Sequence, residues 1–279
     1  MQTQPITDEQ IVNLPPPLPS QKIGRYKVIG QLGAGGMGVV YEVIDEQGLM
    51  WALKKCHPDH PDAAQRFRRE YLVLKALDHP AIPKVNQYGR CSDGAPFYTM
   101  EICRGLDLRQ AVRRSPAIVL PLLRQLAGVM VYLERQGVVH RDIKPENVII
   151  TRQGLKLVDF GLAQDNDRDT RITEIGIVVG SPTYIAPEQI KDGAPASHKT
   201  DLYAFGVVAY EMIEGRPPFK ADSTVALVYQ HVFNVPPAMK SDNVSDGIKA
   251  LIMLLLSKDP DHRPSIRPVL QNLDLELSI

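Results

Sequence analysis

A cluster of glycines near the start of the chain has the spacing of a phosphate-binding loop. Gly33, Gly35 and Gly38 occupy the first, third and sixth positions of the motif, where they allow a tight turn with bare backbone amides. Strand-like residues follow, whereas a dinucleotide fingerprint opens a helix. We therefore predict a hairpin over phosphates, with a glycine-rich turn that binds nothing as the alternative. The loop comprises Leu32, Gly33, Ala34, Gly35, Gly36, Met37, Gly38, Val39 and Val40.

A lysine downstream of this loop is suited to the same phosphates. Ala52 and Lys54 are two residues apart, so in a strand they face one side. A small residue beside a lysine suits a flat base and its charged phosphates. Most lysines are only solvated, but Glu70 lies on a predicted helix further along. A buried lysine needs such a carboxylate to stay charged.

The densest group of reactive residues is the segment His140-Arg141-Asp142-Ile143-Lys144-Pro145-Glu146-Asn147. It places a carboxylate, a lysine and an amide within one short stretch of chain. Asp159 then follows a strand-like run at 155–158 and precedes Phe160 and Gly161. An Asp and an Asn held close together offer the hard oxygen ligands that Mg²⁺ prefers.

Taken together, these motifs resemble the eukaryotic-type (Hanks-type) Ser/Thr protein kinase domain, and especially its bacterial members. They occur in the family's order and are followed by Ala186-Pro187-Glu188. The resemblance covers about residues 24–275. It implies an α+β, bilobal fold, with a small antiparallel β-sheet lobe that carries one helix and a larger, mainly α-helical lobe.

The resemblance also implies a role for each matching residue. Lys54, held by Glu70, would pair with the α- and β-phosphates of ATP. Asp142 would orient the substrate hydroxyl and accept its proton, and Lys144 would neutralise charge on the transferring phosphoryl group. Such a site works because the transition state spreads negative charge over phosphoryl oxygens.

Further positions match the metal and nucleotide sites of the family. Asn147 and Asp159 would hold Mg²⁺, with Mn²⁺ as a second ion that fits such ligands. Backbone groups of Glu101 and Cys103 would bind the adenine edge, and Asp107 is placed to meet the ribose.

Two departures and two structural matches complete the comparison with the family. Trp51 replaces the usual valine before Ala52, so it fits only if its ring points away from the nucleotide. Ser181 stands where these kinases usually have Thr, a change that keeps the hydroxyl. Asp201 matches the residue that anchors the catalytic loop from a buried helix, and Arg263 matches the arginine that pairs with Glu188.

The segment between Asp159 and Glu188 is long and polar in its middle, as mobile or functional loops are. Arg141 directly precedes Asp142, which in this family marks kinases that are switched by loop phosphorylation. We predict autophosphorylation at Thr170 or Thr173, because a phosphate there could pair with Arg141. Two solvated threonines without a regulatory role are the alternative.

Three functions are open at this point. The first is a Ser/Thr protein kinase that acts on protein substrates with ATP. The second is a pseudokinase that serves only as a binding scaffold, which the presence of all the charged catalytic residues disfavours. The third is a small-molecule phosphotransferase, which the polypeptide-docking segment Ala186-Pro187-Glu188 disfavours. Similar bacterial kinases dimerise through the small lobe, so a homodimer is compatible with the resemblance.

The hydrophobic periodicity agrees with two lobes. We predict strands in the first third of the chain, over 26–29, 39–43, 49–53 and 97–102, and a helix over 63–77 whose apolar residues form one face. After Gly105 the pattern becomes helical, with helices predicted over 118–133, 201–214, 223–233 and 245–257. The domain boundaries follow as an N-terminal lobe over 23–100, a hinge over 101–105 and a C-terminal lobe over 106–275.

Composition limits the remaining possibilities. The 279 residues contain 32 Lys plus Arg and 32 Asp plus Glu, and this balance argues against a nucleic-acid partner bound through a bulk basic field. Cys56, Cys91 and Cys103 are widely spaced and indicate reduced thiols in a cytoplasmic protein. The longest apolar run is too short to span a bilayer. Residues 1–22, with prolines at 15–17 and 19, are predicted to form a flexible arm.

Overall fold

The computed structural model describes residues 22–35, 38–57, 63–161, 182–191 and 194–278. Their contacts form two compact units. One contains the described residues up to Ala64 together with Val85–Ile102, and the other contains Gln65–Lys84 and the described residues from Cys103 onward. The division after Ile102 falls inside the segment predicted to be the hinge. The helix α1 (Ala63–Ala76), which the sequence pattern groups with the sheet, falls mostly in the second unit.

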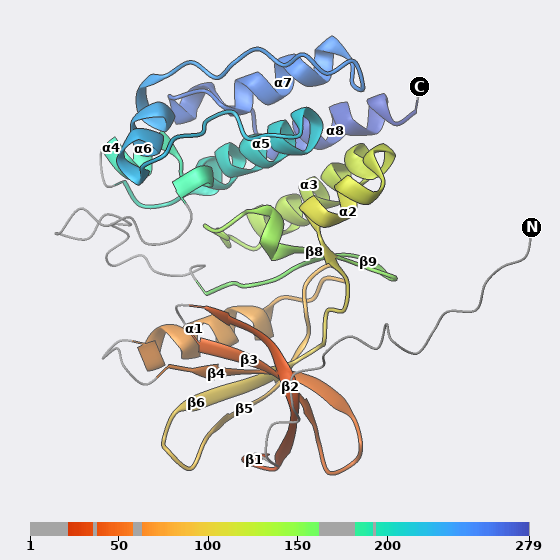
Figure 1. The fold of residues 1–279 in the computed structure, drawn as a ribbon, viewed down its shortest axis with the longest axis vertical. Helices are drawn as coiled ribbons and strands as arrows, with labels where there is room; N and C mark the ends of the chain where they lie inside the picture. Colours follow the sequence, from red (N-terminus) through yellow and green to blue (C-terminus); the bar gives the residue numbers. More distant parts are fainter. Residues whose placement is uncertain (1–21, 36–37, 58–62, 162–181, 192–193, 279) are drawn as a thin grey trace, which may run out of the picture. The chain divides into compact units, whose positions relative to one another are not determined.

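The first unit is a six-stranded antiparallel sheet with the strand order β1-β2-β3-β4-β6-β5, strongly curled in Figure 1. Its strands are β1 (Lys22–Ile23), β2 (Tyr26–Gly35), β3 (Gly38–Ile44), β4 (Met50–Cys56), β5 (Val85–Arg90) and β6 (Pro96–Met100). Every pairing is antiparallel, and all neighbours follow one another directly in the chain except β4 and β6, between which α1 and β5 intervene. The sheet confirms the predicted strands and adds β1 and β5.

Alternating side chains on one face of this sheet build its core. The buried residues are Ile23, Tyr26, Val28, Val43, Leu53 and Phe97. Tyr26 and Phe97 meet edge to face, with their ring centroids 6.0 Å apart. The Tyr26 hydroxyl reaches out of the apolar cluster and donates to Gln87 Oε1 at 2.7 Å, which satisfies its polar end.

The second unit is mainly helical. Besides α1 it contains α2 (Leu108–Arg114), α3 (Val119–Arg135), α4 (Pro187–Lys191), α5 (His198–Glu214), α6 (Thr224–Phe233), α7 (Asp246–Leu255) and α8 (Ile266–Glu276). A small sheet is formed by β7 (Leu106–Asp107), β8 (Val148–Thr151) and β9 (Gly154–Leu157) in that order. Short 3-10 turns span Pro116–Ile118, Pro145–Asn147, Pro182–Tyr184 and Pro260–His262.

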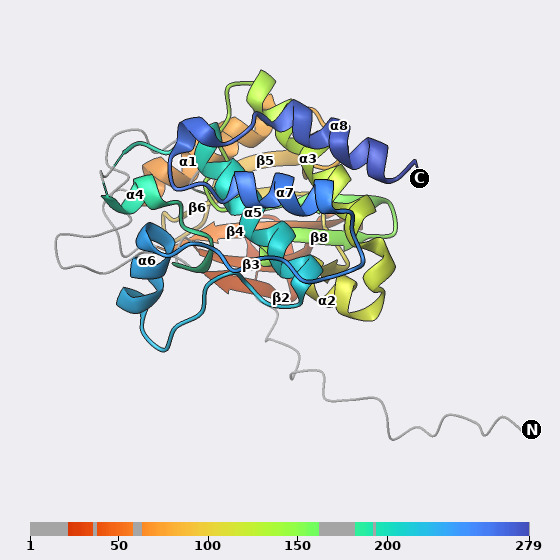
Figure 2. The same ribbon diagram turned by 90° about the horizontal axis from the view of Figure 1, so that it is seen from above.

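Helix α5 lies at the centre of this unit, among α3, α7 and α8 (Figures 1 and 2). Its residues from Thr200 to Ile213 are all buried, which explains why apolar side chains occur all around it. Ser197 and Thr200 form a capping box at its start, and Gly215 ends it with φ of 73°. The central helix is therefore fixed at both ends.

These two units confirm the predicted α+β fold. Among the described helices, none combines the length and apolar character needed to cross a bilayer. All three cysteines lie in the described part of the chain, and none of them forms a disulfide there.

Candidate active site

The segment that contains Asp142 is anchored to the buried helix α5. The backbone N–H of His140 donates to Asp201 Oδ2 and that of Arg141 donates to Oδ1, each at 2.7 Å. One buried carboxylate thus fixes two consecutive peptide groups through charge-assisted hydrogen bonds, which are stronger than neutral ones. This is the anchoring role that the sequence predicts for Asp201.

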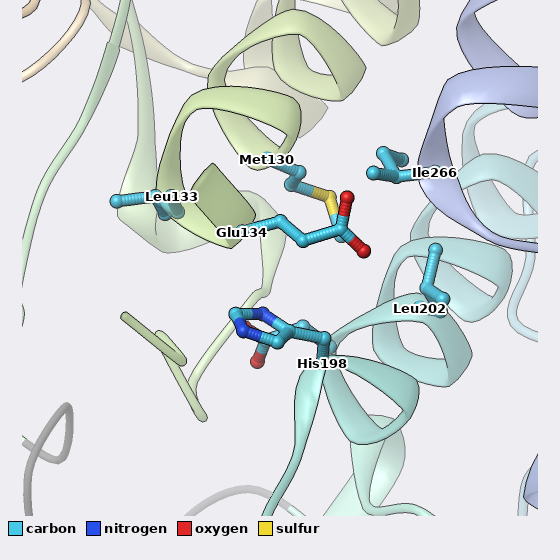
Figure 3. A pocket seen from close by; sticks show the side chains of 7 residues that line it. Met130, Leu133, Glu134, His198, Leu202 and Ile266 are labelled. Atoms are coloured by element: carbon cyan, nitrogen blue, oxygen red, sulfur yellow. The ribbon is translucent and has the colours of Figure 1, made fainter. Parts of the chain in front are cut away.

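The helices pack tightly behind this anchor. Figure 3 shows Met130, Leu133 and Glu134 of α3 facing His198 and Leu202 of α5, with Ile266 of α8 beside them. They line a partly open hollow of about 10 Å³, at the lower limit of what one water occupies. Asp201 also lines this space and is only 4% exposed.

Two residues of the site adopt a backbone conformation that is unusual outside glycine. Arg141 has φ of 69° and Asp159 has φ of 63°, and no other non-glycine residue of the described ranges has a positive φ. Such conformations cost free energy and persist only where the surroundings enforce them. Both coincide with predicted functional positions, since Arg141 directly precedes Asp142 and Asp159 is itself a predicted metal ligand.

The side chains of Asp142, Lys144 and Asn147 form one hydrogen-bonded group. Lys144 Nζ lies 2.6 Å from Asp142 Oδ2. Asn147 Nδ2 donates to the same oxygen and to the Asp142 carbonyl, both at 2.9 Å. The amide nitrogen of Asn147 therefore faces Asp142, and its amide oxygen is left to act as a hard ligand for a cation.

A hairpin brings Asn147 and Asp159 together. Strands β8 and β9 pair with Val148 opposite Leu157, and the ladder continues through Val158 N–H, which donates to the Asn147 carbonyl at 2.9 Å. Asn147 and the Val158-Asp159 pair thus lie at the same end of the hairpin. The predicted metal ligands, which are 12 positions apart in the chain, become neighbours through strand pairing.

This pair of ligands fits a divalent ion that is shared with phosphates. In the described part of the chain, no group of three or more His, Cys, Asp or Glu side chains could hold a metal. An ion at Asn147 and Asp159 would take its other ligands from phosphate and water oxygens, which is the usual way that Mg²⁺ is bound.

His140 is a structural residue of this site. Its ring is completely buried, lies edge to face on Phe160 at 4.6 Å, and its Nε2 is 3.3 Å from the Val158 carbonyl. Burial lowers the pKa of His140 below its ordinary value. A neutral imidazole therefore ties the Asp142 segment to the Asp-Phe-Gly motif.

In the first unit, the glycine cluster forms the β2–β3 hairpin that the sequence predicts. Gly33 pairs with Val40, Ala34 with Val39 and Gly35 with Gly38. A Cβ atom at Gly33 or Gly35 would meet no atom within 4 Å, so a ligand can approach the backbone there. Leu32 also lies on β2, whereas Gly36 and Met37 lie outside the described residues.

Gly38 is required by the fold itself. Its φ is 154°, and a Cβ there would lie 2.1 Å from the Lys55 carbonyl oxygen. No side chain fits such a contact. The close approach of β3 and β4 therefore requires the third glycine of the motif, whether or not a ligand binds.

The Trp51 ring lies on the face of β4 opposite Ala52 and Lys54, as the sequence requires. Its indole N–H donates to Asp45 Oδ2 at 2.9 Å, and the ring packs against the core of the sheet. Because successive strand residues alternate in direction, Ala52 and Lys54 lie on the opposite face of β4. Lys54 and Glu70 belong to different units, and their pairing stays a prediction.

The remaining predicted residues differ in how far the structure describes them. Glu101 and Cys103 lie on either side of the boundary between the units. Asp107 already caps α2, because its carboxylate accepts the Gln110 N–H at 2.8 Å. Thr170 and Thr173, the predicted phosphorylation sites, and Ser181 lie outside the described residues.

A cluster that sequence reasoning missed surrounds Arg109 on α2. Its guanidinium contacts Glu146, Tyr184 and Glu211, which lie 37, 75 and 102 positions away in the chain. No motif spacing relates these residues, so only the fold reveals the cluster.

The chain matches the protein kinase domain family over residues 26–273. It belongs to this family. The kinase domain is 37% identical over 262 residues to the serine/threonine-protein kinase pkn2 of Myxococcus xanthus, covering 86% of this chain and 31% of that protein. It is 36% identical to the probable serine/threonine-protein kinase SCO3848 of Streptomyces coelicolor, with 86% and 38% covered. Against the serine/threonine-protein kinase PknA of Mycobacterium tuberculosis the identity is 34%, with 86% and 58% covered.

These relatives are bacterial and are named Ser/Thr protein kinases, which confirms the family predicted from the motifs. The kinase domain spans between 31% and 58% of the length of these three relatives.

Proposed function

We propose that this kinase domain transfers the γ-phosphoryl group of ATP to Ser and Thr hydroxyls of proteins. The observation that carries the proposal is the setting of Asp142. Its Oδ2 is bonded by Lys144 Nζ at 2.6 Å and Asn147 Nδ2 at 2.9 Å, and Asp201 fixes the two peptide groups before it. A base held this firmly is ready to act without reorganising.

Asp142 and Lys144 of the second unit would have separate roles in the transfer. The substrate hydroxyl oxygen forms a bond to the γ-phosphorus while the bond from that phosphorus to the β–γ bridging oxygen breaks, leaving ADP. Asp142 Oδ1, the oxygen without these two contacts, would accept the hydroxyl proton. Lys144, held beside Asp142, would place its positive charge against the transferring group.

The proposal includes a divalent cation bound by Asn147 and Asp159. Mg²⁺ is the expected ion and Mn²⁺ the alternative, because both prefer oxygen ligands. When bound, the cation neutralises charge on the phosphate oxygens. The contribution of the chain is to hold the two ligands side by side through the β8–β9 hairpin.

Transfer of labelled phosphate from ATP to a generic basic protein tests this function. The wild-type domain is expected to label Ser and Thr in the acceptor, and Asp142→Asn is expected to lose the activity. Equal labelling by both proteins would contradict the proposal. A domain that binds ATP but labels nothing would favour a pseudokinase scaffold, and labelling confined to small molecules would favour a small-molecule phosphotransferase.

Regulation by autophosphorylation at Thr170 or Thr173 is part of the proposal. A phosphate adds up to about two negative charges, which Arg141 could bind. Intact-mass and peptide analysis after incubation with ATP should find phosphate within residues 165–183. The Thr170→Ala, Thr173→Ala double variant should lose it, and phosphate found only elsewhere would contradict the assignment.

Use of ATP further leads us to propose a cytoplasmic location, which cell fractionation would test. The homodimer remains a proposal from the resemblance alone, and sedimentation of the purified domain would test it. Binding of nucleic acid is not expected, because the formal charge of the chain is zero.

A further inference from the structure

A row of paired residues crosses the sheet of the first unit on the face opposite its apolar core. The pairs run from Lys22 of β1 through Lys27 of β2 and Ile44 of β3 to Met50 of β4. Strands β2, β3 and β4 are neighbours in the curled sheet of Figure 1. Directly paired residues point to the same side of a sheet, and the next residue of β2, Val28, is buried in the core. The four side chains of the row therefore share the opposite face.

Two lysines stand directly opposite one another at the β1 end of this row. Lys22 and Lys27 are both exposed, and neither forms an ion pair with any residue that the structure describes. Like charges in direct cross-strand contact destabilise a sheet. A carboxylate that pairs with both lysines would remove this cost, so the pair indicates a binding site for an acidic segment.

The other end of the row is apolar and exposed. Met50 is 44% exposed, and its chain neighbour Leu49 is 53% exposed. On β2, Ile29 is 47% exposed and lies two positions after Lys27. The residue between them is buried in the core, so both turn away from it. We refer to Lys22, Lys27, Ile29 and Met50 together as the lysine–methionine surface.

The acidic residues of the neighbouring β3–β4 turn do not pair with these lysines. Asp45 accepts the indole N–H of Trp51 and two backbone N–H groups of its own turn. Glu46 lies beside Asp45 on the same turn and is exposed. A carboxylate that compensates the two lysines therefore has to come from another segment.

Residues 1–21, which precede β1, have a composition that matches this surface. They contain two acids, Asp8 and Glu9, and no Lys or Arg. The apolar residues around the acids are Ile6, Ile11, Val12 and Leu14. Prolines at 15–17 and 19 lack the N–H that a sheet ladder needs, which disfavours a simple continuation of β1 along the edge of β2. The segment therefore matches the face of the sheet better than its edge.

The link between the two acids and the sheet is long enough for docking within one chain. Residues 10–21 separate Glu9 from Lys22, and fully extended they would span about 40 Å. The row from β1 to β4 is only about 14 Å wide. A tethered segment has an effective concentration of about millimolar, so contacts that are individually weak are enough to hold it.

We propose that the lysine–methionine surface binds residues 6–14 of the same chain. Asp8 and Glu9 pair with the two lysines. The aliphatic residues beside these acids cover Ile29 and Met50. Docking removes the repulsion between the lysines and takes apolar surface out of water, so it stabilises the first unit. Neither ATP nor phosphoryl transfer enters this contact, which is therefore independent of the proposed function.

Zero-length cross-linking of the full chain with a carbodiimide tests the contact, because the reagent joins a carboxylate to an amine only where the two touch. Peptide mass spectrometry should find one of the two acids joined to Lys22 or Lys27, with a lower yield at high salt. In a mixture of isotope-labelled and unlabelled chains, each cross-link should lie within one isotopic form. Cross-links between the two forms would assign the surface to a second copy and overturn the proposal, as would the absence of any cross-link to these lysines.

Exchange of the charges separates docking from chance contacts of a tethered segment. Asp8→Lys, Glu9→Lys should lower the melting temperature by about 1–3 °C, as expected for the loss of exposed ion pairs. Adding Lys22→Glu, Lys27→Glu should restore the wild-type melting temperature. It should also restore the cross-link, with the acids and the amines exchanged between the segment and the sheet.

The matched control reverses two exposed cations of α2 instead. Arg113→Glu, Arg114→Glu makes the same change in net charge. Added to the reversed segment, it should restore neither the melting temperature nor the cross-link. Rescue by this control, or rescue by neither pair of substitutions, would overturn the proposal.

Met50→Ser tests the apolar part of the contact and decides the matter if a charge-reversed variant does not fold. It should reduce the yield of the cross-link by about twofold, because it removes apolar area without changing a charge. Leu275→Ser, at a position on α8 that is 66% exposed, should leave the yield unchanged. Equal yields in the two variants would overturn the proposed contact.

Discussion

Arg263 and Glu188 form a buried ion pair with two parallel hydrogen bonds. Nη1 and Nη2 of the arginine each lie 2.7 Å from a different oxygen of the carboxylate, and the arginine side chain is 0% exposed. Its remaining donors reach the Ser257 carbonyl at 2.9 Å and the Lys199 carbonyl at 2.7 Å. The pair joins the first turn of α4 to the turn before α8, and it is the pair that the sequence predicts.

Removing the arginine of this pair should strongly destabilise the domain. Arg263→Met leaves the Glu188 carboxylate buried without its cation, which we expect to lower the free energy of unfolding by about 3–5 kcal/mol. Urea unfolding followed by circular dichroism measures the change. The double variant Arg263→Met, Glu188→Gln carries no buried charge and should recover part of the loss. A single variant as stable as the wild type would contradict the role of the pair.

Replacing the proposed base should remove activity without unfolding the domain. Asp142→Asn keeps the size of the side chain but cannot accept the hydroxyl proton, so kcat should fall by about 100- to 10,000-fold. Steady-state rates with ATP and a protein acceptor measure it. Asp274→Asn, a change at an exposed carboxylate on α8, serves as the matched control and should retain the wild-type rate. A similar decrease in both variants would point to a general effect of losing a carboxylate.

The anchor beneath the catalytic segment should affect both stability and rate. Asp201→Ala removes the acceptor of two backbone N–H groups, and each hydrogen bond to a charged group contributes about 1.5–3 kcal/mol. We expect a lower melting temperature and a lower kcat, with little change in the KM for ATP. Asp246→Ala, at the exposed first turn of α7, is the control. An unchanged kcat in folded Asp201→Ala would show that the loop holds its conformation without the anchor.

The glycine hairpin allows a comparison of two similar substitutions. Gly38→Ala places a Cβ against the Lys55 carbonyl at a φ that disfavours side chains, whereas Gly35→Ala meets no atom within 4 Å. Only Gly38→Ala should therefore lower the melting temperature, by several degrees, since about 1 kcal/mol shifts it by 2–4 °C in a domain of this size. Differential scanning fluorimetry decides between them, and equal melting temperatures would contradict the structural role of Gly38.

The motifs of the candidate site can be read from the sequence because each of them is local. The loop His140–Asn147 carries its chemistry within a few residues, and strong periodicity reveals helices such as α3 and α5. Strand β5 was missed because its residues Val85–Arg90 are only partly buried and mostly polar, so no alternation stands out. Helix α2 is not predicted because its seven residues are too few for a periodic pattern to stand out, whereas α8 has buried apolar residues at 266, 269 and 273 that its periodicity could have revealed.

The sequence cannot reveal contacts between side chains that are far apart in the chain and belong to no common motif. Arg109 meets Glu211 from 102 positions away, and charged residues of both signs occur throughout the chain. Trp51 illustrates an intermediate case, since alternation predicts its direction but not its partner, Asp45.

His231 should make the stability of the domain depend on pH. Its side chain is completely buried, with Nδ1 2.9 Å from the Tyr203 hydroxyl, while its carbonyl accepts from Lys258 Nζ at 2.6 Å. Burial and the charge of Lys258 lower the pKa of His231 from 6.5 to about 3. Between these values the unfolded chain binds the proton and the folded one does not, so stability falls as the pH decreases through 6.5. Between pH 8 and pH 5, this residue alone should lower the free energy of unfolding by about 2 kcal/mol. Urea unfolding at both pH values should show this loss of stability in the wild type and a correspondingly smaller loss in His231→Gln. Equal losses in the two proteins would show that His231 is not the group responsible.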